Sequence, residues 1–307
     1  MAHPHGWAIR LSKGETAMKF FEMKVGDTVV RAELLTDKAP RICRAFEKSL
    51  PAKSFGVNAK FAGEETIVMV PFYTEPENEV GSVSPGDIGY YPTRQTLCLF
   101  YGKIMPFASV SLFARVVPQD LKKAQAAGRD ILKTGALPVT LSLVGGRKRP
   151  TAQRRRKASP YNAVALLEKA LEDVWADEPA DVKRLRRFKR PPMGNLPCVF
   201  YANFDLFWAT ENLLATRPLV EKRLTAAQSG AVVATLLRRT RSRVAHWGFE
   251  DTSAVLDKVA KQVEKARSRK EVVSTIEAAV LYIDRVQNWV DAMLPWNDLD
   301  ETLKLLR

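Results

Sequence analysis

The chain has 307 residues, of which 46% are apolar and 27% are charged, a balance typical of a globular protein large enough for two domains. It contains no apolar run long enough to span a bilayer and no basic segment followed by an apolar leader, so we expect neither a membrane protein nor a secreted one. Cys43, Cys98 and Cys198 show no paired spacing, which favours buried thiols in the reducing cytoplasm.

The net charge of +14 is concentrated in two segments. Residues 147–157 hold seven cations and residues 183–190 hold six, without any acid, so they supply 13 of the 14 excess charges. Such runs favour a solvated linker or a contact with an acidic partner. Nucleic-acid binding is a weaker hypothesis, because no reading helix or aromatic-interleaved basic surface accompanies the charge. It predicts an affinity for nucleic acid that falls steeply as the salt concentration rises.

The first half of the chain predicts a small closed β-barrel with two short helices. Gly26-Asp27 separates two β-rich runs, which is a strong hairpin signal. One helix is expected to begin at 37–40 and to stop at Pro51, and a second is expected over 119–127, ending near Gly128. Residues 75–84 are expected to form a polar loop. Strands are expected over 18–25, 28–35, 58–61, 66–71, 90–91, 97–101, 108–117 and 137–144.

From residue 161 onward the apolar residues recur at helical spacing. Residues 179–197 are rich in proline and basic residues and are expected to form an irregular connector. Thr225 is expected to cap a long helix and Gly248 to end it. Helices are expected over 161–175, 203–216, 225–247, 252–267, 271–294 and 298–306. Expected core positions in the fifth of these are Ile276, Val280, Ile283, Val286 and Val290.

The predicted organisation is therefore an α+β chain in four parts. These are an N-terminal extension over 1–17, a β-barrel over 18–145, a basic linker over 146–160 and an all-α region over 161–307.

The segment from Gly86 to Lys103 combines a Gly-Asp turn, Tyr90-Tyr91, Arg94 and an apolar strand. Phenols and cations beside an apolar strand could line a small-molecule pocket. The alternative is that the aromatic residues are ordinary core and the cations ordinary surface.

This segment, with Asp37-Lys38-Ala39-Pro40, residues 58–65 and Phe113-Ala114-Arg115-Val116, resembles the small bacterial cyclophilin-like barrels of unassigned function. The resemblance covers roughly residues 18–145 and implies a cyclophilin-like closed barrel. The Phe-His-Arg segment of the prolyl isomerases is not found. A barrel of this kind joined to a helical region also resembles the cucumopine and mikimopine synthases, which condense histidine with 2-oxoglutarate without a cofactor.

Several chemistries are poorly supported by the residues. His3, His5 and His246 are dispersed, as are the cysteines, so we expect no metal site and no histidine-based triad. No glycine-rich nucleotide motif opens a helix after a strand, which argues against NAD(P)H. We therefore expect no cofactor.

Acid–base and imine chemistry remain, carried by tyrosine, lysine, glutamate and arginine. The candidate catalytic residues are Tyr90, Tyr91, Tyr101, Lys103, Glu64 and Glu79. The candidate substrate-binding residues, which would hold carboxylates or line the pocket, are Arg94, Lys60, Arg115, Phe100 and Asn58. Asn58 stands where relatives often carry histidine. Only one of Glu64 and Glu65 can point into the barrel mouth, because neighbours on a strand face opposite ways; a solvated turn is the alternative for both.

The first hypothesis is a cofactor-independent opine synthase that joins an amino acid (histidine) to a 2-oxo acid (2-oxoglutarate) through an imine and a Pictet–Spengler-type ring closure. The helical region would then be a lid or the interface of a homodimer. The alternative is a non-catalytic cyclophilin-like ligand-binding or scaffold protein whose helical domain binds a partner. In either case the expected ligands are small molecules, and no membrane is involved.

Overall fold

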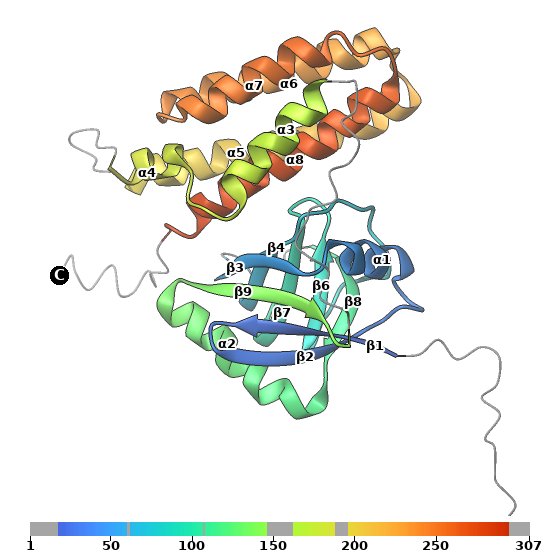
Figure 1. The fold of residues 1–307 in the computed structure, drawn as a ribbon, viewed down its shortest axis with the longest axis vertical. Helices are drawn as coiled ribbons and strands as arrows, with labels where there is room; N and C mark the ends of the chain where they lie inside the picture. The colour runs from blue at the N-terminus through green and yellow to red at the C-terminus, as the bar shows by residue number, and fades with distance from the viewer. Residues whose placement is uncertain (1–17, 60–61, 107, 146–161, 188–195, 295–307) are drawn as a thin grey trace, which may run out of the picture.

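The computed structural model describes residues 18–59, 62–106, 108–145, 162–187 and 196–294. In this part of the chain, a β-barrel is followed by a layer of helices that lies on one side of it (Figure 1). The predicted helix over 298–306, the candidate residue Lys60, the N-terminal extension and the basic run over 147–157 lie outside the described residues. None of the helices described is both long and apolar enough to cross a membrane.

The strands close into a barrel, as predicted. Eight of them are antiparallel neighbours in the order β2-β1-β9-β3-β4-β7-β6-β8, and β2 also pairs with β8, while β5 joins the edge of β8. Gly26, with φ +54°, occupies the two-residue turn between β1 and β2, where Val25 pairs with Thr28. The strands are β1 (Lys19–Val25), β2 (Thr28–Leu34), β3 (Ala52–Asn58), β4 (Gly63–Met69), β5 (Glu79–Val80), β6 (Asp87–Tyr91), β7 (Thr96–Ile104), β8 (Val110–Val116) and β9 (Ala136–Leu143).

The interior of the barrel is a packed apolar core. Side chains alternate between the two faces of a strand, and the inward set includes Ile88 and Tyr90 of β6 and Leu97 and Leu99 of β7, all at most 1% exposed. Helix α1 (Pro40–Ser49) adds Phe46 to the same core. The predicted pocket therefore does not lie between these inward side chains.

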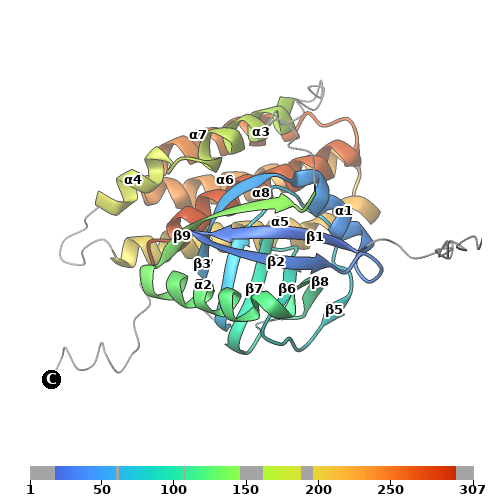
Figure 2. The same ribbon diagram turned by 60° about the horizontal axis from the view of Figure 1, so that its bottom comes forward.

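Helix α2 (Leu121–Thr134) covers the end of the barrel that is remote from the helical layer (Figures 1 and 2). The prediction that it ends near Gly128 is wrong, because the helix continues for six more residues. A Cβ atom at Gly128 would lie 2.3 Å from Cγ of Tyr101. The glycine is thus the position at which the helix rests directly on the Tyr101 ring, rather than a helix stop.

The helical layer consists of α3 (Asn162–Trp175), α4 (Ala180–Arg187), α5 (Leu196–Lys222), α6 (Ala226–His246), α7 (Glu250–Val263) and α8 (Arg269–Asp291). Thr225 caps α6 through a capping box with Gln228, and the five predicted core positions of α8 are fully buried. Helix α5 extends the predicted 203–216 in both directions. The prediction of an irregular connector over 179–197 is wrong where α4 forms. Asp181 accepts hydrogen bonds from the backbone N–H groups of Asp251 and Thr252, and these bonds anchor this basic helix to α7.

Arg285 of α8 joins the helical layer to the barrel. It is 1% exposed, and its guanidinium lies 4.6 Å from the ring centroids of both Phe55 and Trp175 and 5.1 Å from that of Trp289. Its Nη1 also donates to Ser54 Oγ at 3.1 Å. Because Ser54 and Phe55 belong to β3, this side chain holds α8 against the start of that strand.

Candidate functional site

The structure separates the candidate residues of the sequence into distinct places. Tyr90, Tyr91 and Arg94 lie at the rim of the barrel that faces the helical layer. The Tyr90 hydroxyl is buried and donates to the Phe72 carbonyl at 3.1 Å. Arg94 points away from the barrel, where its Nη1 donates to Gln287 Oε1 of α8 at 2.7 Å.

A second group lies at the opposite end of the barrel, beside α2. The Tyr101 hydroxyl donates to Asn58 Oδ1 at 2.5 Å, and Glu64 accepts a hydrogen bond from the backbone N–H of Lys103 at 2.6 Å. A surface hollow of about 270 Å³ borders this end at 62–63 and 103–105. These contacts tie side chains to neighbouring structure, and the catalytic or binding roles predicted for the four residues stay predictions.

The remaining candidates lie on the outer surface of the barrel. Arg115 donates to Asp87 Oδ1 at 2.7 Å, and Glu79 lies in β5 opposite Ser111 of β8. Phe100 is fully buried in a small outer cluster. Their predicted roles are likewise untested.

The outer face of β4 and β7 carries a buried carboxyl, Glu65, which is 2% exposed and lies opposite Phe100. Burial raises the pKa of Glu65 to about 7, and a hydrogen bond with the Cys98 thiol opposes this shift. Thr96 Oγ1 lies 3.8 Å from the Cys98 sulfur. A carboxyl with such a pKa can both donate and accept a proton at neutral pH.

Tyr91 borders the same outer face. Its hydroxyl donates to the Ala108 carbonyl at 3.2 Å. Burial raises the pKa of Tyr91 above its ordinary value, and the nearby Cys98 and Glu65 raise it further. Tyr91 is therefore a neutral hydrogen-bonding phenol next to Glu65.

A second buried carboxyl, Asp284 of α8, lies at the interface between the barrel and the helices and is 4% exposed. Among the described residues, neither of its oxygens has a hydrogen-bond partner. Burial raises the pKa of Asp284 to about 7, an effect that Arg94 and the polar groups of Thr210 and Gln95 oppose. The Thr210 hydroxyl itself donates to the Phe207 carbonyl at 2.9 Å.

The turn between β6 and β7 brings Arg94 and Gln95 to this interface. The Arg94 guanidinium lies 4.9 Å from the ring centroid of Phe207 on α5. Gln95 is fully buried and has a φ of +43°, a left-handed conformation that is uncommon for residues other than glycine. Such conformations are often kept at functional sites, where surrounding structure holds them in place.

Arg94 acts electrostatically on Asp284 and on the Cys98 thiol beside Glu65. Its charge lowers the pKa of Asp284 and of the Cys98 thiol, which is the partner of Glu65, and it also acts on Glu211 of α5. Cys98 follows Gln95 by three positions, a rise of about 10 Å along an extended chain. We define Glu65, Arg94, Gln95 and Asp284 as the candidate site.

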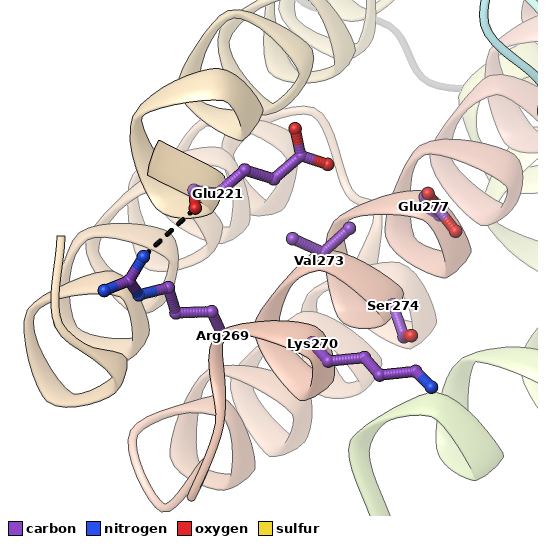
Figure 3. Close-up of a pocket in the computed structure, with 6 residues that line it drawn as sticks. All are labelled: Glu221, Arg269, Lys270, Val273, Ser274 and Glu277. Atoms are coloured by element: carbon purple, nitrogen blue, oxygen red, sulfur yellow. Dashed lines mark hydrogen bonds between the residues drawn. The ribbon is translucent and has the colours of Figure 1, made fainter. Parts of the chain in front are cut away.

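A larger surface hollow, of about 370 Å³, lies between the end of α5 and the start of α8. Figure 3 shows the residues that line it. Arg269 donates there to the Glu221 carbonyl at 3.1 Å. The acids Glu221 and Glu277 both pair with Arg217, at 3.0 and 3.1 Å. Because its acids already have a cationic partner, this hollow is a weaker candidate than the interface around Asp284.

Sequence reasoning recognised Arg94 and considered Glu65, but it did not identify Asp284 or Gln95. A signal for Asp284 was available: it follows the core residue Val280 by four positions and precedes Gln287 by three, so it lies on a face of α8 next to the core. An acid at such a position is unusual unless it is paired or functional.

The comparisons with known proteins concern the fold. Residues 22–143, the barrel, match the family described as "Protein of unknown function (DUF3830)". No curated protein matches the sequence. A solved structure of McbB in complex with tryptophan is similar over 94% of this chain and 99% of that one, with a TM-score of 0.81 and 17% identity. The solution structure of hypothetical protein AF2241 from Archaeoglobus fulgidus covers 43% of this chain and 98% of its own, with a TM-score of 0.33 and 22% identity.

The likeness to McbB extends over both the barrel and the helical layer, so the two parts together form one known architecture. At this level of identity it defines the fold and leaves the chemistry to be argued from the site.

Proposed function

We propose that this protein is a cofactor-independent enzyme that condenses an amino acid with a 2-oxo acid to an imine and then closes a ring in a Pictet–Spengler-type step. One observation carries the proposal: two buried carboxyls, Glu65 and Asp284, have pKa values raised to about 7, and the charge of Arg94 acts on Asp284 and on the Cys98 thiol that is hydrogen-bonded to Glu65. Paired proton-transfer groups beside a cation suit a reaction between carboxylated substrates.

The chemistry requires two proton-transfer events. Imine formation joins nitrogen to the carbonyl carbon and expels the carbonyl oxygen as water, for which an acid must supply a proton. Ring closure joins a carbon of the aromatic ring to the imine carbon, after which a base removes the proton from that ring carbon. We assign the second role to Glu65, because its outward strand position lies among apolar residues and its pKa favours proton exchange near neutrality.

Arg94 is the group best placed to hold a substrate carboxylate. It uses one N–H donor for Gln287, and its planar guanidinium offers further donors suited to a carboxylate. Holding two small reactants together can contribute on the order of 7–11 kcal/mol to catalysis in favourable cases. A cofactor is therefore not required by the energetics.

The amino acid is proposed from two sources. The resemblance to the opine synthases suggests histidine, and the similar fold of McbB was solved with tryptophan bound. Both carry an electron-rich ring that can attack an imine. We propose histidine with 2-oxoglutarate as the first pair to test and tryptophan as the second amino acid.

The test is to incubate purified protein with 2-oxoglutarate and either amino acid, without NAD(P)H, and to search by mass spectrometry for a cyclised product of the summed mass minus one water. We expect product with the wild-type chain and at least a 100-fold lower rate with Glu65→Gln, because the amide cannot accept the ring proton. Glu22→Gln, on an exposed position of β1, should react like wild type.

A parallel assay of Glu64→Gln compares the neighbouring glutamate that the sequence singled out. Absence of product at every pH from mildly acid to alkaline would contradict the proposal. Binding of an amino acid without any product would instead support the alternative of a non-catalytic ligand-binding protein, and thermal shift measurements detect such binding directly.

A further inference from the structure

Three acceptor oxygens without a donor lie together at the interface between the barrel and α8. They are both carboxyl oxygens of Asp284 and Oε1 of Gln95, and all three are buried without a hydrogen-bond partner in the described structure. The two side chains are close enough for the Gln95 amide to lower the pKa of Asp284. Buried acceptors are nearly always paired, so a cluster of three calls for an explanation.

Thr210 and Gln95 lie near Asp284 and lower its pKa through side-chain hydrogen bonding, but neither makes a hydrogen bond of normal geometry to its oxygens. Gln95 cannot reverse its amide without losing a contact, because its Nε2 donates to the Pro92 carbonyl at 2.6 Å. The Thr210 hydroxyl is committed to Phe207. Arg94 directs Nη1 to Gln287 rather than to Asp284. A protonated Asp284 could donate one hydrogen bond, which would still leave the set incompletely paired.

We infer that Asp284 and Gln95 form an ammonium-binding subsite that holds the α-amino group of the amino-acid substrate. The identity of the ligand rests on the function proposed above, whereas the presence of the subsite rests on the unpaired acceptors. A primary ammonium carries three N–H donors, which equals the number of oxygens that lack one.

The neighbouring groups suit the rest of an amino acid. Arg94 can bind the α-carboxylate through the donors that it does not use for Gln287. The Phe207 ring, against which Arg94 lies, provides an apolar surface for an aromatic side chain.

The subsite would also start the reaction. The bound ammonium gives one proton to the Asp284 carboxylate, and the resulting amine lone pair forms the C–N bond to the carbonyl carbon of the oxo acid. After a proton moves from this nitrogen to the former carbonyl oxygen, protonated Asp284 returns its proton to the new hydroxyl, which leaves as water. The product is an iminium, and Asp284 is again a carboxylate.

The surroundings of Asp284 support this exchange. The titratable and charged groups that act on it are Arg94 from the turn, Glu211 from α5 and, at the barrel rim, Tyr90. Burial holds the pKa of Asp284 near 7, and a bound ammonium would favour its charged form.

The test is equilibrium binding measured by calorimetry, with L-tryptophan, L-histidine and indole-3-propionic acid as probes and without an oxo acid. Indole-3-propionic acid has the ring and the carboxylate of tryptophan but lacks the amine. We expect the wild-type protein to bind tryptophan at least 10-fold more tightly than this analogue. Asp284→Asn should bind both equally and weakly, while the exposed Asp130→Asn should match wild type.

The comparison between tryptophan and its analogue needs no variant, so it decides the matter even where Asp284→Asn folds poorly. Equal affinity for both probes, or failure of both amino acids to bind, would overturn the subsite. Binding that depends on the amine, without any condensation product, would leave the subsite standing and refute the proposed reaction. Condensation by Asp284→Asn with an unchanged KM for the amino acid would refute the subsite and leave the proposed reaction standing.

Discussion

At the scale of single residues, the proposed chemistry depends on two acids that the fold shields from water. Nothing in the sequence around Glu65 or Asp284 marks either residue as unusual. In the folded protein Glu65 is only 2% exposed and Asp284 only 4% exposed. Burial disfavours the charged form, which raises the pKa of both to about 7. Lys103 and Glu64, which the sequence favoured, are instead held to each other through the backbone.

The raised pKa of Glu65 predicts a pH-dependent stability. The folded protein keeps this proton up to about pH 7, whereas the unfolded chain releases it near pH 4.5, so the contribution of Glu65 to stability falls as pH rises between these values. The Glu65→Gln variant has no carboxyl at this position, so its stability does not show this decrease with rising pH. Its free energy of unfolding relative to wild type should therefore increase from pH 5 to pH 8, by at most about 3 kcal/mol.

Urea unfolding of both proteins at the two pH values measures this difference. The exposed Glu22→Gln variant should show a difference from wild type that is nearly independent of pH. A Glu65→Gln curve that runs parallel to wild type over the whole range would show that Glu65 is ionised in the folded protein as easily as in water.

At the scale of elements, the contact between α2 and the barrel depends on a missing side chain. The ring of Tyr101 occupies the space that a Cβ atom at Gly128 would need. Gly128→Ala improves helix propensity by about 1 kcal/mol but forces the helix away from the ring, and overpacking of this kind costs about 1–3 kcal/mol.

We therefore expect Gly128→Ala to be neutral or destabilising, although the same exchange on an exposed helix surface stabilises. Thermal unfolding measures the change in stability. The control is the opposite exchange at an exposed position of the same helix, Ala126→Gly, which is expected to cost about 1 kcal/mol. A clear rise in Tm for Gly128→Ala would contradict the close packing of α2 on Tyr101.

At the scale of the whole molecule, Arg285 is one of the residues that join the barrel to the helices. Burial lowers the pKa of Arg285 to about 9, so a costly desolvation is accepted for contacts with three rings and with oxygens of β3 and α3. The candidate site needs this union, because Arg94 and Gln95 come from the barrel and Asp284 from α8. The homodimer expected from the sequence stays a prediction.

Arg285→Ala should weaken this junction, with a loss on the order of 3 kcal/mol from cation–π and charged hydrogen-bond contacts. Calorimetry should show the single unfolding transition of wild type broadening or splitting into two. The exposed Arg239→Ala on α6 serves as the control and should unfold like wild type. An unchanged single transition in Arg285→Ala would show that other contacts hold the two parts together.

The sequence by itself determined most of the secondary structure and the closed barrel, because these follow from local signals. The Gly26-Asp27 turn, the Thr225 cap and the spacing of Ile276, Val280 and Ile283 each act within a few residues. Where local signals misled, as at Gly128 and over α4, a contact with a distant element was responsible.

The candidate site was decided by tertiary structure. Glu65 and Asp284 belong to different halves of the chain, and neither carries a motif. Their pKa values depend on burial, and the unpaired oxygens of Asp284 and Gln95 depend on which donors the fold leaves out of reach. Desolvation and hydrogen-bond pairing are properties of the packed molecule, so no pattern along the chain expresses them.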